Sequence, residues 1–111
     1  MALVYLYQNR RVTKDITIVD VNGDTITPSV ADKVRATIGR LGETAKLTVT
    51  SGTPTANGST FTKGAANRLT LVAVDIQSIS PGTYSLLIDY YNGVDNSWKN
   101  VDRQCCVIEK T

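Results

Sequence analysis

Apolar and polar residues alternate along much of this chain with the two-residue period that β-strands produce. Within residues 33–38, and again within residues 45–50, every second residue is apolar. Each stretch therefore predicts a strand with one buried face and one wet face, and we expect the two strands to pair across the intervening turn. The residues expected to face inward are Val34, Ala36, Ile38, Ala45, Leu47 and Val49.

Turn motifs separate the predicted strands. Asn22-Gly23 lies between two alternating stretches, and this dipeptide is the strongest short-range signal for a hairpin. Asn92-Gly93 follows an apolar and aromatic stretch over residues 83–91, and residues 98–108 supply the returning strand. The last part of the chain is therefore predicted to form a long β-hairpin.

A tyrosine corner is predicted at the start of this hairpin. In Pro81-Gly82, proline presets its own φ and glycine accepts a positive φ, which gives the following strand a defined start. Tyr84 follows directly, and we expect its hydroxyl to bond backbone before the turn. Pro81, Gly82 and Tyr84 are therefore interpreted as structural residues.

The first strand is predicted at residues 3–7, which are β-branched, apolar or aromatic and precede a polar break. An unpaired strand of this kind invites another chain to its edge, so it is interpreted as an edge strand or an arm that contacts a neighbour. Residues 1–13 are accordingly assigned to an N-terminal strand or arm, and residues 14–111 to one β-sandwich domain. The interface residues expected here are Leu3, Val4, Tyr5, Leu6 and Tyr7.

The central part of the chain is less regular. Residues 51–67 are small and polar around Phe61, which predicts a long loop or irregular ribbon with a role in contacts. Residues 68–74 resume strand character, and residues 75–80 form a link. No helical period appears, although residues 28–32 could form one turn. The pattern as a whole predicts an all-β, antiparallel, immunoglobulin-like β-sandwich of about seven strands.

Composition narrows the possible partners. A chain of 111 residues has the size of one domain, and its formal net charge of +2 gives no support to a nucleic-acid partner. No apolar run approaches the ~20 residues that cross a membrane. Cys105 and Cys106 are adjacent and would point to opposite faces of a strand, so we expect two free thiols.

Residues that carry catalytic chemistry are sparse. The chain has no histidine, which removes His-dependent nucleophilic catalysis and the commonest transition-metal ligand. Residues 20–24 resemble the start of a calcium loop, but Ala31 stands where a bidentate glutamate is required. The sequence predicts no enzyme, no metal site and no cofactor. Solvated surface carboxylates are expected at Asp15, Asp20, Asp24, Asp32 and Asp89.

Aromatic residues gather around the last predicted turn. Tyr90, Tyr91 and Trp98 flank Asn92-Gly93, a position suited to anchoring a protein interface, stacking on a sugar or capping the core. A basic stripe is also expected on the outward faces of two neighbouring strands, where a solvated face and a protein contact are the two interpretations. It is formed by Lys33, Arg35 and Lys46.

The order of these signatures resembles the small immunoglobulin-like domains of tailed-bacteriophage virions, in particular the amino-terminal domain of phage baseplate upper proteins. The resemblance covers roughly residues 14–109 and rests on the Asn22-Gly23 turn, a link containing Pro28, the Ile79–Tyr84 segment and the strand from Trp98. It implies a virion protein, assembled in the host cytoplasm, that contacts other virion proteins and copies of itself. A tail, baseplate or fibre adaptor and a capsid decoration (cement) protein are both compatible with it.

Two functions remain open at this stage. The first is a structural phage protein that makes subunit contacts through residues 3–7, residues 51–67 and the aromatic end. The second is a carbohydrate-binding module of a phage adsorption device, in which the aromatic rings stack on a host glycan. Deleting residues 1–8 should abolish assembly under the first hypothesis, whereas Trp98→Ala should selectively abolish glycan binding under the second.

Overall fold

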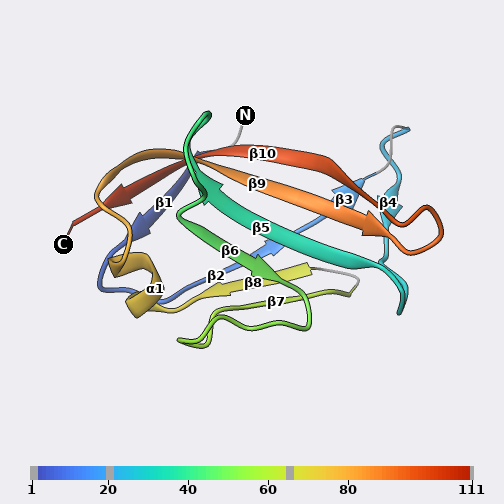
Figure 1. The fold of residues 1–111 in the computed structure, drawn as a ribbon, viewed down its shortest axis with the longest axis horizontal. Helices are drawn as coiled ribbons and strands as arrows, with labels where there is room; N and C mark the ends of the chain where they lie inside the picture. The colour runs from blue at the N-terminus through green and yellow to red at the C-terminus, as the bar shows by residue number, and fades with distance from the viewer. Residues whose placement is uncertain (1–2, 20–21, 65–66, 111) are drawn as a thin grey trace.

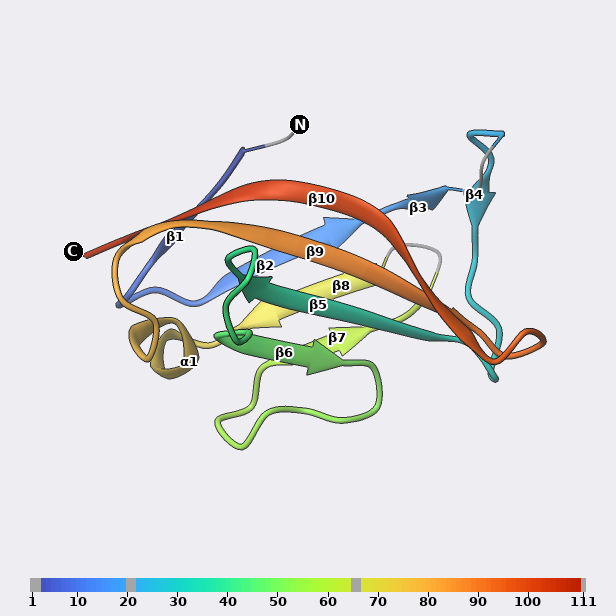
Figure 2. The same cartoon turned by 45° about the horizontal axis from the view of Figure 1, so that its top comes forward.

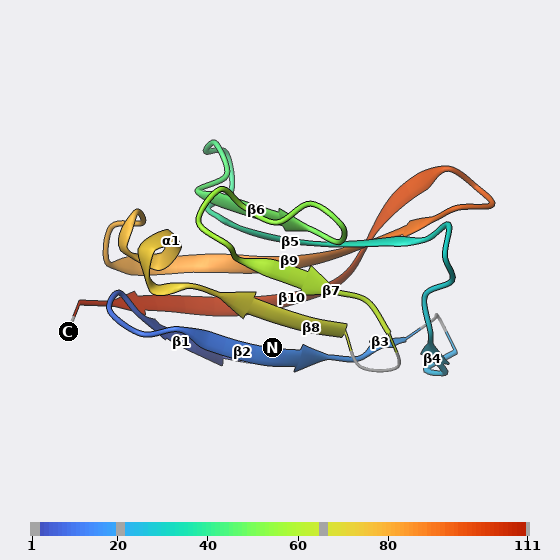
Figure 3. The same cartoon turned by 90° about the horizontal axis from the view of Figure 1, so that it is seen from below.

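The computed structural model of the protein describes residues 3–19, 22–64 and 67–110, most of which form β-strands and the turns between them. The strands form two packed sheets and a small separate hairpin. Figure 3 shows the three-stranded sheet lying over one face of the five-stranded sheet. The prediction of an all-β fold is confirmed.

The larger sheet has five strands in the order β1-β10-β9-β5-β6. β9 and β10 form the predicted long antiparallel hairpin, and β5 pairs with β6 as the alternating pattern predicted. β5 also pairs with β9, which places it in the middle of the sheet. The bounds are β1 Leu3–Tyr7, β5 Lys33–Gly39, β6 Leu47–Thr50, β9 Gly82–Asn92 and β10 Ser97–Glu109.

The smaller sheet has three strands in the order β2-β8-β7. A separate hairpin of β3 and β4 forms around Asn22-Gly23, as predicted, although residues 20 and 21 lie outside the described part of the chain. Ten strands are thus present in the described residues, rather than about seven. The remaining bounds are β2 Val12–Ile16, β3 Ile18–Val19, β4 Thr25–Ile26, β7 Thr60–Thr62, β8 Asn67–Leu71 and α1 Ala73–Gln77.

β1 corrects two predictions. It runs parallel to β10, with Leu3 opposite Cys105, so the larger sheet is mixed and not entirely antiparallel. The alternation of apolar and polar residues indicates which face of a strand is buried. It does not indicate whether the neighbouring strand runs parallel or antiparallel, so the sequence could not predict the parallel pairing. β1 is an edge strand of its own sheet, and Val4 and Leu6 are only 8% and 2% exposed. These two residues therefore belong to the core of this chain and not to an interface.

The core lies between the two sheets. The inward residues of β5 are 0–3% exposed, as their alternation predicted. Phe61 faces them from β7, opposite Leu69 on β8, and is 2% exposed. The prediction that Phe61 belongs to an interface is wrong, because a ring enclosed between two sheets cannot reach a partner. The loop predicted over residues 51–67 is interrupted here by a strand that pairs with β8.

Two local predictions also differ from the structure. Ala45 is exposed because β6 begins only at Leu47. The link predicted over residues 75–80 begins within the short helix α1, whose five residues are too few to show a helical period in the sequence. Ile76 of α1 is fully buried, so packing against the core stabilises the helix.

The predicted tyrosine corner is confirmed. The Tyr84 hydroxyl donates a hydrogen bond of 2.6 Å to the Ser80 carbonyl, across the Pro81-Gly82 turn. The Arg40 guanidinium lies 4.2 Å from the centroid of the Tyr84 ring, and Arg40 Nε donates to the Thr83 carbonyl. These contacts fix the start of β9 to the end of β5.

Different elements lie at the two ends of the molecule. Figures 1 and 2 show the β9–β10 turn, the β3–β4 hairpin and the start of β5 gathered at one end, with α1 and the C-terminus at the other. Within the described ranges, no helix is long and apolar enough to cross a membrane.

Candidate interaction face

The predicted aromatic residues divide between the two faces of the β9–β10 hairpin. Trp98 lies directly opposite Tyr91, and both rings are half-buried on the outward face of the larger sheet, away from the core. Tyr90 points to the other face and is 8% exposed. It therefore caps the core, and its predicted place in an interface is wrong.

Each outward ring is covered by a cation from β5. Arg35 Cζ lies 4.0 Å from the Trp98 ring centroid, and Lys33 Nζ lies 5.2 Å from the Tyr91 centroid. The two rings are 5.3 Å apart and tilted by 53°, a geometry that aromatic pairs favour. The register explains the arrangement, because Lys33 is opposite Tyr91 on the neighbouring strand. We call these four residues the aromatic–cation cluster.

The carboxylate of Asp89, on β9, holds this cluster in place through hydrogen bonds. Arg35 donates from Nε and Nη2 to Asp89 Oδ2, at 3.2 and 3.0 Å. Asn100 Nδ2 donates to the other oxygen, Oδ1, at 3.2 Å. The Asp89 side chain is only 14% exposed, so it is not the fully solvated carboxylate that the sequence suggested. Asp89, opposite Arg35 on the neighbouring strand, thus holds Arg35 in place while the guanidinium lies over Trp98.

A third ring with its own cation lies on the edge strand β1, at the opposite end of β10 from Trp98. Arg10 Cζ is 5.3 Å from the centroid of Tyr7, the last residue of β1. Tyr5 is 49% exposed, and its register opposite Val107 places it on the outward face as well. The sequence pointed to Tyr5 and Tyr7, but not to Arg10, which only the turn from Tyr7 to Arg10 brings back over the ring.

Asp32 is a buried anchor beneath this end of the sheet, which corrects its prediction as a surface carboxylate. It is 7% exposed and accepts hydrogen bonds from the Tyr90 hydroxyl, the Gly93 amide and the Ser29 amide. The bonds from Gly93, Tyr90 and Ser29 lower the pKa of Asp32 to about 2. Burial and the neighbouring Asp32 carboxylate raise the pKa of Tyr90 to about 12. One carboxylate therefore joins the start of β5 to the tip of the β9–β10 hairpin.

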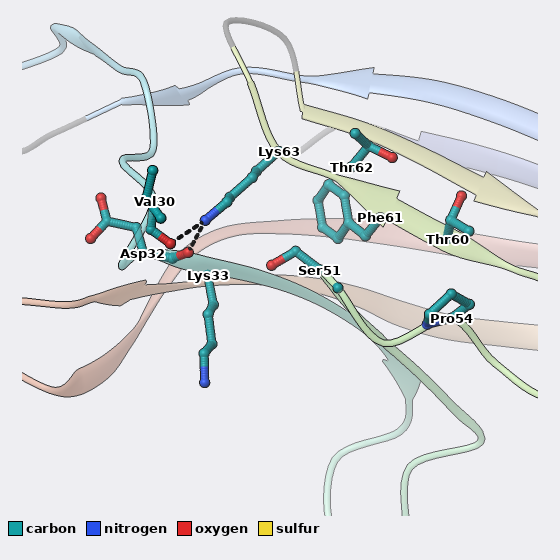
Figure 4. A pocket seen from close by; sticks show the side chains of 10 residues that line it. Val30, Asp32, Lys33, Ser51, Pro54, Thr60, Phe61, Thr62 and Lys63 are labelled. Atoms are coloured by element: carbon teal, nitrogen blue, oxygen red, sulfur yellow. Dashed lines mark hydrogen bonds between the residues drawn. The ribbon is translucent and has the colours of Figure 1, made fainter.

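Lys63 holds the same turn from the smaller sheet. Its ammonium group donates to the carbonyls of Ser29, Val30 and Asp32, at 2.9, 2.8 and 2.6 Å. An open cavity of about 540 Å³ lies beside it, with Phe61 on its wall, and Figure 4 shows Lys33 extending away from Lys63 there. The three donors of Lys63 are all used by backbone, so this ammonium supports the turn and is not available to a ligand.

A second buried aspartate anchors the loop after β6. Asp75 of α1 is 5% exposed and accepts hydrogen bonds from Thr55, Asn57 and Ser59. Burial alone would raise the pKa of Asp75, but the hydrogen bonds from Ser59, Thr55 and Asn57 outweigh it and lower the pKa. The polar residues of this loop thus bind their own chain, a role the sequence did not suggest.

The sequence predicts no metal site and no disulfide among the acidic and cysteine side chains. No group of three or more His, Cys, Asp or Glu residues lies close enough to hold a metal ion in the ranges the structure describes. Cys105 and Cys106 are free, one half-buried and one buried, as predicted. Burial, followed by the proximity of Cys105, raises the pKa of the Cys106 thiol to about 11, so this group stays protonated and unreactive near neutral pH.

No protein-family model and no curated protein matches this chain. The geometry of the outward face is accordingly the main support for a function.

Proposed function

We propose that this chain is a non-enzymatic structural protein of a tailed-phage particle, an immunoglobulin-like domain that makes contacts between subunits. A tail, baseplate or fibre adaptor and a capsid decoration protein are the two roles compatible with the sequence resemblance. The tyrosine corner at Tyr84 and the two packed sheets support the immunoglobulin-like assignment. The aromatic–cation cluster is the single observation that carries the proposal.

The cluster has the properties of a docking surface. Tyr, Trp and Arg are the residues that contribute most binding energy at protein interfaces. Here Trp98, Tyr91 and Arg35 are already fixed against one another and against Asp89 before any partner arrives. A partner therefore does not have to order these side chains on binding, which removes part of the entropic cost of association.

A carbohydrate-binding module is the competing function. Stacking on a sugar ring requires an open aromatic face, and the half-buried Trp98 and Tyr91 each have one face covered by a cation of β5. This coverage favours a protein contact over sugar stacking.

Particle incorporation tests the proposal. Electron microscopy of intact particles should locate the subunit in the capsid or tail, and Trp98→Ala should reduce its copy number per particle at least tenfold. Thr13→Ala, on the outward face of the smaller sheet, is the matched control and should be incorporated normally. Particles that carry the Trp98 variant at full occupancy would contradict the proposal, and loss of binding on a glycan array without loss of incorporation would favour the carbohydrate function.

A further inference from the structure

We propose that the outward face of the five-stranded sheet recognises an acidic protein surface, in which carboxylates surround an apolar or aromatic side chain. This inference rests on the proposed function and names the chemistry of the partner.

The first support is how the cations of this face are held. Lys33 lies over a neutral ring, Tyr91, and forms no ion pair within the described residues. Arg10 is held in the same way over Tyr7, but at the opposite end of β10, where Tyr7 pairs with Glu109. A carboxylate that positions a cation also cancels its charge. An aromatic ring positions the cation through its quadrupole and leaves the full positive charge available to a partner.

The second support is the balance of charge on the face. The register places Lys33, Arg35 and Arg103 at outward positions of β5 and β10. The acidic residues at outward positions of β9 and β10 are Asp89 and Glu109. Asp89 is 14% exposed and already accepts two hydrogen bonds from Arg35. The face thus presents more positive than negative charge, although the whole chain carries a net charge of only +2.

The third support is the apolar surface between these charges. Tyr91 and Trp98 lie among the cations and are half-buried, which leaves part of each ring to meet an apolar group. Complementary charge around such a centre steers association and excludes wrong partners, while the aromatic centre supplies most of the affinity.

The cluster fits a protein better than a nucleic acid. Nucleic-acid surfaces need many cations that follow a phosphate backbone, and their affinity falls steeply with salt for every phosphate contacted. Here the cations surround two rings that tilt by 53° against each other, so the rings do not form a parallel platform on which successive bases could stack.

Binding to defined polymers tests this inference. The probes are an immobilised random copolymer of glutamate and tyrosine, polyglutamate, heparin and double-stranded DNA, each presented to the full chain at low and at 200 mM salt. We expect the glutamate–tyrosine copolymer to bind most tightly. Tighter binding to heparin or DNA, or equal binding to all four probes, would overturn the inference.

Charge-removing variants of the same face sharpen the test. Lys33→Gln and Arg35→Gln should each weaken binding of the glutamate–tyrosine copolymer at least fivefold. Arg68→Gln, which removes an exposed charge from the other sheet, should leave the binding unchanged. Lys33 is exposed and forms no ion pair within the described residues, so we expect its variant to keep the fold. Equal affinities of the Lys33 and Arg68 variants would overturn the inference.

Particle incorporation separates this inference from the proposed function. If Trp98→Ala blocks incorporation while Lys33→Gln and Arg35→Gln do not, the structural role stands and the acidic partner is wrong. If both sets of variants fail to incorporate, the acidic partner is supported.

Discussion

The outward faces of the two sheets differ in how their polar and charged side chains are paired. On the smaller sheet, the hydroxyl of the exposed Thr13 lies 3.4 Å from that of the buried Thr70, and the exposed Arg68 and Asp15 form an ion pair at 2.8 Å. These groups satisfy one another, and their charges cancel. The larger sheet exposes rings covered by cations, two of which have no carboxylate partner in the described chain. The outward face of the smaller sheet therefore has no unpaired charge among these groups. The outward face of the larger sheet retains positive charge and apolar ring surface that a partner could bind.

The support beneath the two faces differs as well. Asp32 joins β5 to the tip of the β9–β10 hairpin through three hydrogen bonds and is 7% exposed. On the smaller sheet, the carboxylate of Asp15 is exposed and accepts its hydrogen bonds from the Arg68 side chain on the surface. The larger face is therefore built on a buried polar anchor, and substitutions should affect the two faces to very different extents.

Removal of the buried anchor should produce the largest effect. Asp32→Ala leaves the Tyr90 hydroxyl and the Gly93 and Ser29 amides without their acceptor, and we expect the free energy of unfolding to fall by roughly 2–4 kcal/mol. Urea denaturation measures this, with Asp15→Ala as the matched control. Equal stability of the two variants would show that both faces rest on surface contacts alone.

The same anchor sets the pH limits of the larger face. Because the pKa of Asp32 is lowered to about 2 from 3.8, its contribution to stability is complete above pH 3.8 and is lost as pH falls towards 2. Because the pKa of Tyr90 is raised to about 12 from 10.0, the contribution of its neutral hydroxyl is complete below pH 10 and is lost as pH rises towards 12. Thermal unfolding of the native chain and of Tyr90→Phe should differ less at pH 11.5 than at pH 7.

Removal of the central ring should cost less. Trp98→Ala loses the contact with Tyr91 and the cation contact with Arg35, which together are worth about 1–2 kcal/mol at a half-buried site. Denaturant unfolding followed by circular dichroism gives the difference. A loss as large as that of Asp32→Ala would mean that the ring belongs to the core and is not a docking surface.

The brace between Arg35 and Asp89 should contribute about 1 kcal/mol, because Arg35 is partly exposed and water screens the pair. Trp98 is the only tryptophan of the chain, so its fluorescence reports on this site alone. Arg35→Gln should increase quenching of Trp98 by acrylamide. Unchanged quenching would show that the guanidinium does not cover the ring in solution.

The smallest effect is expected on the other face. Arg68 lowers the pKa of Asp15 through its hydrogen bond, but both groups are exposed, so Arg68→Gln should leave the melting temperature unchanged between pH 5 and 8. A clear decrease would show that this face too depends on its charges, and would remove the contrast between the two.

Local patterns made much of the fold predictable. The alternation over residues 33–38 correctly placed the buried face of β5, and Asn22-Gly23 and Pro81-Gly82 marked real turns. Each of these features depends on residues within one strand or one turn, so their physical cause is visible in the sequence.

The features that the sequence did not predict depend on residues that are distant in the chain. The buried Asp32 carboxylate accepts a hydrogen bond from Gly93, 61 positions later in the chain. No local sequence pattern could predict that partner. Lys33 and Arg35 were correctly placed on an outward stripe, but the rings that hold them lie on strands whose register sequence does not fix. Phe61 looked like a loop residue because β7 is only three residues long and is defined by its pairing with β8.

The parallel pairing of β1 with β10 also affects how the chain is made. Leu3 pairs with Cys105, so β1 has no partner until the residues of β10 have been translated. At about 5–20 residues per second, the apolar Leu3–Tyr7 strand waits roughly 5–20 s. During that time it is exposed to chaperones and to other nascent chains. The larger sheet can therefore close only after β10 has been translated, and this late step is where misassembly during translation would begin.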